Sequence, residues 1–310
     1  MIPMAKIIAV ANRKGGVGKT TTVICLGFFV GRRGRKVLLV DLDPQNALSA
    51  ALSTPGEKAS GAVGIFRGET DANRIVSRTV LPSVDLLPYA CPTPMRTGAE
   101  RPAAKGKPVP TSLDYEALFA TPKTAAVFGR ALLKISGNYD YVLVDSPPGS
   151  SAVVRFALAH AESVIIPLQC QPLALRIMPR ILSDIRELIE TSNARLSIEG
   201  VLLTMYDFYE PTSENIAGQV WSYFPKKSTF RAVIRKSPVF EQIFDSETNP
   251  LLAEDLPEEL LDYDVIAQLI LAREPSRTPA SGGPLSQQDA IPSAAASSIK
   301  DRQAATKSAG

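Results

Sequence analysis

Residues 12–22 read NRKGGVGKTTT, and this stretch decides the fold. It follows the apolar run KIIAVA at residues 6–11 and precedes an apolar helical pattern that ends at Gly34. A glycine-rich loop between a strand and a helix lets backbone N–H groups surround the phosphates of a nucleotide. Glycine is needed because the backbone must come close to the phosphates and adopt dihedrals that a Cβ would obstruct. We therefore expect a phosphate loop after the first strand of an α/β fold.

The rest of the chain alternates short apolar runs with longer helical patterns. Most of the runs are apolar on both faces, which is typical of strands sandwiched between helices in a mostly parallel sheet. The expected strands are residues 6–11, 36–41, 84–88, 139–145, 163–168 and 199–206. The expected helices are residues 20–33, 115–135, 151–161, 173–193 and 256–273. The pattern predicts a single α/β domain of the phosphate-loop type, with helices on both faces of a twisted sheet.

Composition limits the class of protein. The chain has 310 residues, of which 45% are hydrophobic, so it can bury a substantial core. Its apolar runs are far shorter than the roughly 20 residues of a membrane span, and we expect a cytoplasmic protein. Cys25, Cys91 and Cys170 form no C-x-x-C pair, which disfavours a disulfide framework, a zinc site or an iron–sulfur cluster. A net charge of +3 is too small to indicate a nucleic-acid partner by itself.

Two segments differ in composition from the expected core. Residues 89–112 are rich in Pro and Gly, and we interpret them as an exposed basic loop. The cations of this loop are Arg96, Arg101, Lys105 and Lys107. Residues 274–310 consist mainly of small and polar residues, which cannot offset the entropy of folding, so we expect a disordered tail. The expected domain is therefore residues 5–273.

The loop residues have separate roles in holding a nucleotide. The backbone of Gly15, Gly16, Val17 and Gly18 is expected to wrap the phosphates. We expect Lys19 to contact the β- and γ-phosphates, the Thr20 hydroxyl to ligate Mg²⁺, and the Thr21 hydroxyl to lie near the α-phosphate. A glycine turn that merely joins a strand to a helix is the alternative reading of the same residues.

Three carboxylates follow two of the expected strands. Asp41 and Asp43 end LLVDLDPQ at residues 38–45, and Asp145 lies in YVLVDSPPG at residues 141–149. Side chains at the carboxyl ends of parallel strands project into the crevice where ligands of open α/β sheets bind. Beside a phosphate loop, they indicate a magnesium shell and a positioned water. Asp at a strand end is also a common turn cap, so each carboxylate alone has a purely structural reading.

The set of motifs resembles the ParA/MinD family of deviant Walker-A ATPases, and within it the ParA (Soj-like) partition branch. The resemblance extends over residues 5–273 in the family's order, leaving aside the loop and the tail. The motifs are KGGVGKTTT, VLLVDLDPQNA, YDYVLVDSPPG, SVIIPLQCQPLAL and GVLLTMYD. The resemblance implies ATP and Mg²⁺ as cofactors, a homodimer that sandwiches the nucleotides, and hydrolysis that is slow until a partner protein stimulates it.

The resemblance also assigns roles to individual residues. Lys14 matches the extra lysine that reaches the phosphates bound by the other protomer, where its charge serves as an arginine finger does elsewhere. Asp41 matches the residue that orients the water shell of the metal, and Asp43 the residue that positions the attacking water. Asp145 matches the Walker-B aspartate, and residues 147–149 match a loop that senses the γ-phosphate. Lys14, Lys19 and Asp43 are thus the expected catalytic residues, and Thr20, Asp41 and Asp145 the expected metal site.

The resemblance also implies nonspecific binding to DNA through basic residues. The matching segment is STFRAVIRKSPVFEQ at residues 228–242, whose Arg231, Arg235 and Lys236 are the expected phosphate contacts. A solvated polar edge is the alternative reading of these charges. The segment departs from the family pattern because Ile234 stands where relatives have a proline that shapes the adenine pocket.

We therefore expect an ATPase that dimerises with ATP, binds the nucleoid in that state and segregates or positions a cargo. The cargo is a plasmid, a chromosome or a protein assembly, and a ParB-like or other adaptor protein releases the ATPase from DNA by stimulating hydrolysis. One alternative is a MinD-like membrane ATPase, although the tail SSIKDRQAATKSAG lacks a bulky apolar face. A regulator of cellulose synthesis with the same ATPase core is another.

Overall fold

The computed structural model describes residues 5–54, 59–89, 112–149, 151–245 and 248–273. Almost all of the predicted basic loop and the whole predicted tail lie outside the described residues. The chain divides into two compact units, Met1–Gln268 and Leu269–Gly310, and only residues 269–273 of the second unit are described. None of the described helices is long and apolar enough to cross a membrane.

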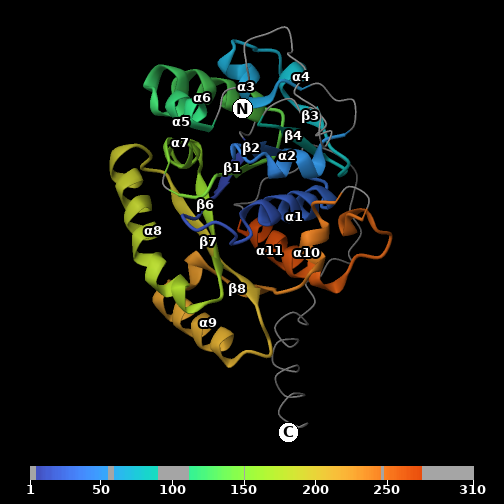
Figure 1. Ribbon diagram of the computed structural model, residues 1–310, viewed down its shortest axis with the longest axis vertical. Helices are drawn as coiled ribbons and strands as arrows, with labels where there is room; N and C mark the ends of the chain where they lie inside the picture. The colour runs from blue at the N-terminus through green and yellow to red at the C-terminus, as the bar shows by residue number, and fades with distance from the viewer. Residues whose placement is uncertain (1–4, 55–58, 90–111, 150, 246–247, 274–310) are drawn as a thin grey trace. The chain divides into compact units, whose positions relative to one another are not determined.

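A single mostly parallel sheet of eight strands, in the order β3-β4-β2-β5-β1-β6-β7-β8, forms the centre of the first unit (Figure 1). The strands are β1 Lys6–Val10, β2 Val37–Asp41, β3 Ser77–Arg78, β4 Val84–Leu87, β5 Tyr141–Asp145, β6 Ser163–Gln169, β7 Ser197–Tyr206 and β8 Thr229–Arg235. Only the β3–β4 pair is antiparallel among the described strands. The predicted α/β class with a mostly parallel sheet is confirmed.

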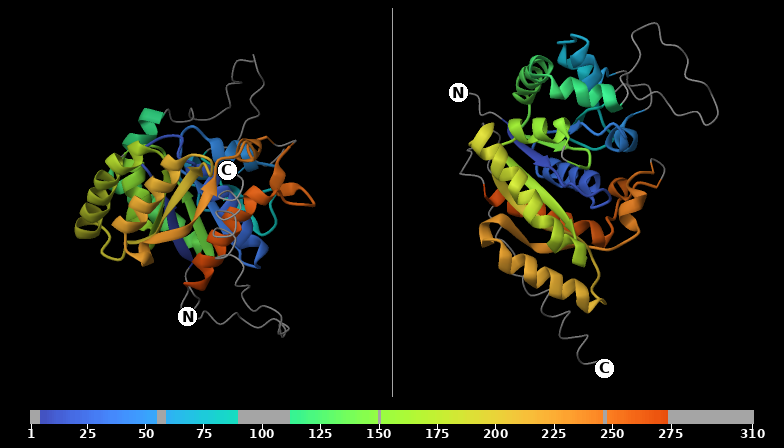
Figure 2. Two further views of the ribbon diagram at one scale, coloured as in Figure 1. Left: turned by 90° about the horizontal axis from the view of Figure 1, so that it is seen from below. Right: turned by 60° about the vertical axis from the view of Figure 1, so that its left-hand side comes forward.

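Helices cover both faces of this sheet. They are α1 Lys19–Arg32, α2 Ala47–Leu52, α3 Gly61–Phe66, α4 Ala72–Ile75, α5 Ser112–Ala120, α6 Pro122–Ser136, α7 Ala152–His160, α8 Pro172–Thr191, α9 Pro211–Tyr223, α10 Val239–Gln242 and α11 Leu261–Ala272. Helix α1 packs on one face of the sheet, and α3 and α5 to α9 bury their apolar sides on the other face. On that second face, α8 and α9 lie beside β6, β7 and β8 (Figure 2).

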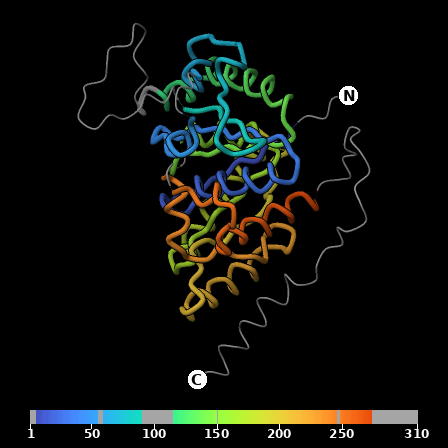
Figure 3. Tube along the Cα trace, turned by 90° about the vertical axis from the view of Figure 1, so that its right-hand side faces the viewer, coloured from blue at the N-terminus to red at the C-terminus, as the bar shows by residue number. Residues whose placement is uncertain are grey.

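The first part of α11 lies beside α1 (Figure 3). The Tyr263 hydroxyl and the Thr22 hydroxyl are 3.0 Å apart, and the Arg33 guanidinium pairs with both carboxylate oxygens of Asp264. Tyr263 is fully buried, so its hydroxyl needs the hydrogen bond that Thr22 supplies. These contacts attach the first part of α11 to α1, the helix that follows the glycine-rich loop.

The structure differs from the sequence predictions at several elements, and the helices α2, α3, α4 and α9 and the strand β3 were not predicted. The single helix expected at residues 115–135 is two helices, because Pro122 lacks an N–H and begins a new helix as its first residue. The helix expected at residues 256–273 begins only at Leu261, after a 3₁₀ turn. Strand β8 was missed, because its sequence TFRAVIR mixes charged and apolar residues as an edge strand does.

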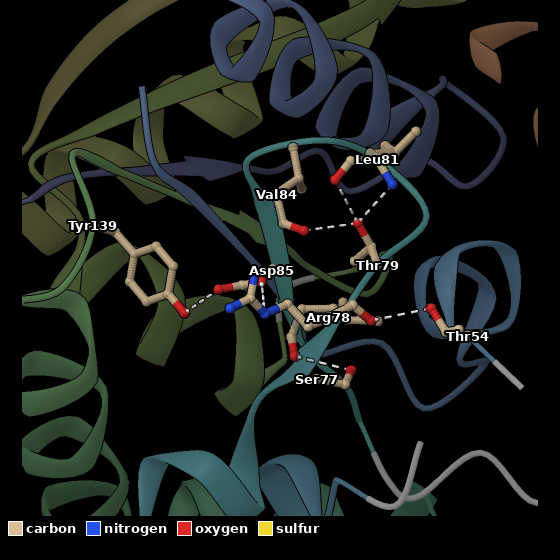
Figure 4. A network of polar contacts seen from close by, with 9 residues as sticks. Thr54, Ser77, Arg78, Thr79, Leu81, Val84, Asp85 and Tyr139 are labelled. Atoms are coloured by element: carbon tan, nitrogen blue, oxygen red, sulfur yellow. Dashed lines mark hydrogen bonds and ion pairs between the residues drawn. The ribbon is translucent and has the colours of Figure 1, made fainter. Parts of the chain in front are cut away.

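The β3 edge of the sheet carries a polar network at the end far from the loop motifs (Figure 4). The Tyr139 hydroxyl donates to Asp85 Oδ2 at 2.9 Å, and Arg78 lies 3.9 Å from the other oxygen of Asp85. Burial, followed by the charge of Asp85, raises the pKa of Tyr139. These residues line a polar hollow of about 560 Å³. Because Arg78 is largely exposed, we interpret the network as a solvated cover for the sheet edge.

Gly200 on β7 provides a test of the packing between β7 and β8. A Cβ added there would lie 2.3 Å from the ring of Phe230, which is fully buried on β8. We expect Gly200→Ala to lower the free energy of unfolding by about 1–3 kcal/mol, because the ring must move. The control is Gly218→Ala on α9, where an added Cβ meets nothing within 4 Å. Urea unfolding followed by circular dichroism measures both, and an unchanged midpoint for Gly200→Ala would contradict this packing.

Candidate functional site

The glycine-rich loop between β1 and α1 is closely held by its own backbone and by β7. Gly16 and Gly18 have φ of 68° and 84°, in the left-handed region that glycine occupies readily. The Val17 carbonyl accepts a hydrogen bond from Thr204 Oγ1 at 3.0 Å, and Val17 itself is buried. The Gly18 carbonyl accepts the first helical bond from the Thr22 N–H at 2.9 Å. The earlier N–H groups of α1 have no intrahelical partner, so the loop presents donors to an anion.

Lys19 provides a buried positive charge at this loop. It is 7% exposed, and its Nζ donates to the Lys14 carbonyl at 3.2 Å. Burial lowers the pKa of Lys19, while the negative charges of Asp145 and Asp43 oppose that shift. A buried ammonium that a carbonyl holds, under the influence of two nearby carboxylate charges, is positioned to bind an anionic group such as a phosphate.

Asp145 and Thr20 face one another at the same edge of the sheet. Thr20 Oγ1 donates to Asp145 Oδ2 at 2.7 Å. Asp145 Oδ1 is buried and has no hydrogen-bond partner among the described residues. Burial raises the pKa of Asp145 well above its usual range, and the charge of Asp41 on the neighbouring strand adds to the shift. A buried carboxylate oxygen with an unused acceptor position suits a cation, so the donor set of Thr20 and Asp145 fits Mg²⁺.

Asp41 and Asp145 are register partners on β2 and β5, which explains why their charges interact. Asp41 Oδ1 accepts from the Asp43 N–H at 3.0 Å, and Asp41 Oδ2 accepts from the N–H and hydroxyl of Ser49 at 2.9 and 2.5 Å. Burial raises the pKa of Asp41 to about 6, against the opposing effect of these hydrogen bonds. Both oxygens of Asp41 are thus engaged within the chain, which suits an orienting role better than direct metal ligation.

Asp43 lies at the rim, because β2 ends two residues before it. It is partly exposed, and its Oδ1 accepts from the Gln45 N–H at 2.9 Å. The turn is fixed further by the bond from the Asn46 N–H to the Asp43 carbonyl at 2.8 Å. A carboxylate fixed by its turn at the mouth of the site is accessible to water.

Lys14 is the second lysine of the loop, and it too makes contacts within the chain. Its N–H donates to Asn12 Oδ1 at 2.9 Å, and its Nζ donates to Gln169 Oε1 at 2.5 Å. Its carbonyl holds Lys19, so the two lysines share one small network. The structure therefore brings Lys14, Lys19 and the carboxylates to one end of the sheet.

Comparison with known proteins identifies the family. A family model described as an AAA domain matches residues 5–92 and 112–198. The sporulation initiation inhibitor protein Soj of Bacillus subtilis is 34% identical over 235 residues, which are 76% of this chain and 85% of Soj. The chain belongs to the ParA/MinD family of deviant Walker-A ATPases.

Other relatives agree with this family assignment. The chromosome partitioning protein ParA of Caulobacter vibrioides is 31% identical over 276 residues, which are 88% of this chain and 96% of that protein. A solved structure named as cobyrinic acid a,c-diamide synthase from Mycobacterium smegmatis, with bound ADP and magnesium, superposes with a TM-score of 0.66 and 27% identity. The match covers 86% of this chain and 94% of that one.

The basic residues predicted from the family pattern do not form one cluster of unpaired cations. Arg231 is exposed on β8, with its guanidinium carbon 5.3 Å from the centre of the Trp221 ring. Lys236 is 71% exposed and lies 4.0 Å from Asp207. Arg235 is only 21% exposed and donates to both oxygens of Asp262, at 2.8 and 2.9 Å. Of the three, Arg231 and Lys236 are therefore the cations most available to a polyanion.

Several residues of this family site were not predicted. Asn12, Gln169 and Thr204 hold the loop through hydrogen bonds, and Ser49 holds Asp41. Gln169 and Thr204 each lie in a quoted family motif, but only the pairing of strands brings them to the loop. Ile234 is buried, so the residue that replaces the family's proline belongs to the core of β8.

Proposed function

We propose that this protein is an ATP-dependent partition or positioning ATPase that works as a dimer. The observation that carries the proposal is the pair of buried charges Lys19 and Asp145, the latter hydrogen-bonded by Thr20, beside a glycine loop that carries a second lysine, Lys14. ATP is the proposed nucleotide, and the ADP and magnesium in the relative from Mycobacterium smegmatis support this choice. The proposed site is formed at the carboxyl ends of β1, β2 and β5.

Each side chain has a distinct role in this proposal. Lys19 and the N–H groups of residues 15–21 hold the phosphates, with the Thr21 hydroxyl near the α-phosphate. Thr20 and Asp145 hold the magnesium, which neutralises phosphate charge when it is bound. Asp41 orients the water shell of the metal. Asp43 positions the attacking water and accepts its proton at the carboxylate.

The role proposed for Lys14 requires two copies of the chain. Lys19 already supplies a cation from within the subunit, so a second lysine at the mouth of the loop is available for the nucleotide of a second copy. There its ammonium stabilises negative charge that develops between the β- and γ-phosphates during cleavage. ATP hydrolysis therefore requires two chains, and ATP acts as a timer for their association.

The dimer binds nonspecific double-stranded DNA, and so the nucleoid in the cytoplasm, while it holds ATP. Pairing doubles the number of cations, and sequence-independent binding needs only such charges. A ParB-like or other cargo adaptor stimulates hydrolysis and releases the dimer from DNA. Binding of a DNA duplex of arbitrary sequence with ATP and with ADP tests this switch, and equal affinity in the two states would exclude it.

Arg231 is expected to contribute directly to this binding. We expect Arg231→Ala to weaken DNA binding in the ATP state and to reduce the slope of log K against log salt concentration by about 2, one phosphate contact for each protomer. Fluorescence anisotropy across a salt series measures this slope. Arg130→Ala is the matched control, because Arg130 is an exposed cation on α6, a helix outside the basic segment at residues 228–242. An unchanged slope in Arg231→Ala would show that Arg231 does not contact the DNA.

A further inference from the structure

The loop residues that lead to Lys14 run alongside β6 after β1 has ended. Val10 is the register partner of Ile165, and the Ala11 N–H donates to the Ile165 carbonyl at 3.1 Å. Asn12 Nδ2 then donates to the Pro167 carbonyl at 2.6 Å. The next step along β6 is Gln169, whose side-chain oxygen accepts from Lys14 Nζ at 2.5 Å. Beyond the end of β1, the loop thus contacts every second residue of β6, first through the Ala11 backbone and then through the side chains of Asn12 and Lys14.

Both partners of the last contact are fixed by the fold. Gln169 is the final residue of β6, partly buried, and its register partner on β7 is Thr204. Lys14 is held at its N–H by Asn12, which is itself buried and bonded to β6. The backbones of both residues are therefore held in place, and the contact between Nζ and Oε1 requires only that the two side chains become ordered within a single subunit.

We propose that Gln169 is a positioning residue that retains Lys14 in its own subunit until a second subunit arrives. The inference rests on the proposed function, because it assumes that Lys14 serves the nucleotide of the partner. For Lys14 to do so, its ammonium must exchange the amide oxygen for a phosphate oxygen of the partner's nucleotide. A phosphate is the stronger acceptor because it is charged, whereas the neutral amide releases the lysine. The hydrogen bond between Gln169 and Lys14 must therefore break when two subunits associate, and its loss weakens their association.

Two substitutions at Gln169 change this contact in opposite directions. Gln169→Glu replaces a neutral acceptor with a carboxylate and strengthens the hold on Lys14. Gln169→Ala removes the acceptor and releases Lys14. Gln171→Glu is the matched control, because it adds the same charge two residues away on an exposed side chain that makes no capping bond.

The contact itself is tested in the full-length chain without nucleotide. Amine acetylation with acetic anhydride, read by mass spectrometry, reports the reactivity of each lysine, with exposed Lys36 as the internal reference. We expect Lys14 labelling to rise about fivefold or more in Gln169→Ala and to fall about two- to fivefold in Gln169→Glu. Gln171→Glu should label as the unsubstituted chain does. Equal Lys14 labelling in all four proteins would overturn the inference.

The consequence is tested by association with ATP and Mg²⁺. We expect the protein concentration for half-maximal dimerisation to rise about two- to fivefold in Gln169→Glu and to fall about fivefold or more in Gln169→Ala. A purely structural role would instead lower dimerisation in both variants, and that result would overturn the inference.

The two possible failures can be told apart. If the unsubstituted chain dimerises with ATP and depends on Lys14, but both Gln169 variants associate as it does, only the role of Gln169 is refuted. If the unsubstituted chain stays monomeric with ATP, the proposed dimer is refuted and the inference with it, whatever the labelling pattern.

Discussion

Lys14→Ala is expected to lower ATP turnover by about 10²–10³-fold, the usual cost of removing one preorganised charge donor from a transition state. The fold and nucleotide binding should remain, because Lys19 and the backbone of the loop hold the phosphates without the Lys14 side chain. Lys14 contributes its carbonyl to Lys19, and alanine keeps that carbonyl. Phosphate release measures turnover, and a fluorescent ATP analogue measures binding.

Two control variants support this measurement. Lys36→Ala removes an exposed lysine at the opposite end of the sheet and should leave turnover unchanged. Lys19→Ala should abolish nucleotide binding itself, which separates loss of the site from loss of the trans charge. Turnover by Lys14→Ala at the rate of the unsubstituted chain would refute the role given to Lys14.

Asp43→Ala is expected to reduce hydrolysis by about 10²–10⁴-fold, the typical contribution of a positioned general base. The ATP-bound dimer should then accumulate, because Asp43 lies at the rim and does not hold the loop. Size-exclusion chromatography with ATP and Mg²⁺ should show the doubled mass, and ADP should leave a monomer. Asp43→Asn is the matched control for structure, since its amide oxygen can still accept from the Gln45 N–H. An Asp43→Ala chain that remains monomeric with ATP would contradict this assignment.

Mixing these two inactive variants tests the trans arrangement directly. In a mixed dimer, the Lys14→Ala subunit keeps its own Asp43 and receives Lys14 from the Asp43→Ala subunit. One of its two sites is then complete, so an equal mixture should recover about a quarter of the unsubstituted turnover if the subunits pair at random. If Lys14 acted within its own subunit, no site in the mixture would be complete and turnover would stay low.

Much of the candidate site could be predicted from local sequence alone. The glycines of residues 15–18 and the buried strands on either side indicated a phosphate loop, because few other functions require that backbone in that place. Asp41 and Asp145 were placed at one edge because adjacent parallel strands end together, and the structure makes them register partners. Elements with mixed character, such as β8 and the helix break at Pro122, were missed because pattern reasoning depends on uniform periodicity.

The roles of the basic residues could be distinguished only in three dimensions. The sequence presents Arg231 and Arg235 as equivalent cations four residues apart. The structure shows Arg235 bound to both oxygens of Asp262, a partner 27 residues away, whereas Arg231 lies on the surface against an indole ring. Charge in a sequence is local, but its availability depends on which carboxylates the fold brings near.

The sequence by itself determined the fold class and the family, and it predicted the residues proposed to face a nucleotide, because close phosphate contact restricts backbone and side chains over a few consecutive positions. Only the tertiary structure decided that Asp145 has an oxygen without a partner, that both oxygens of Asp41 are already engaged, and that Gln169 holds Lys14. The Gln169–Lys14 contact joins segments 155 residues apart, and the paired strands that carry Asp41 and Asp145 are more than a hundred residues apart. Their geometry follows from strand order and register, and neither is determined by the residues near any one motif.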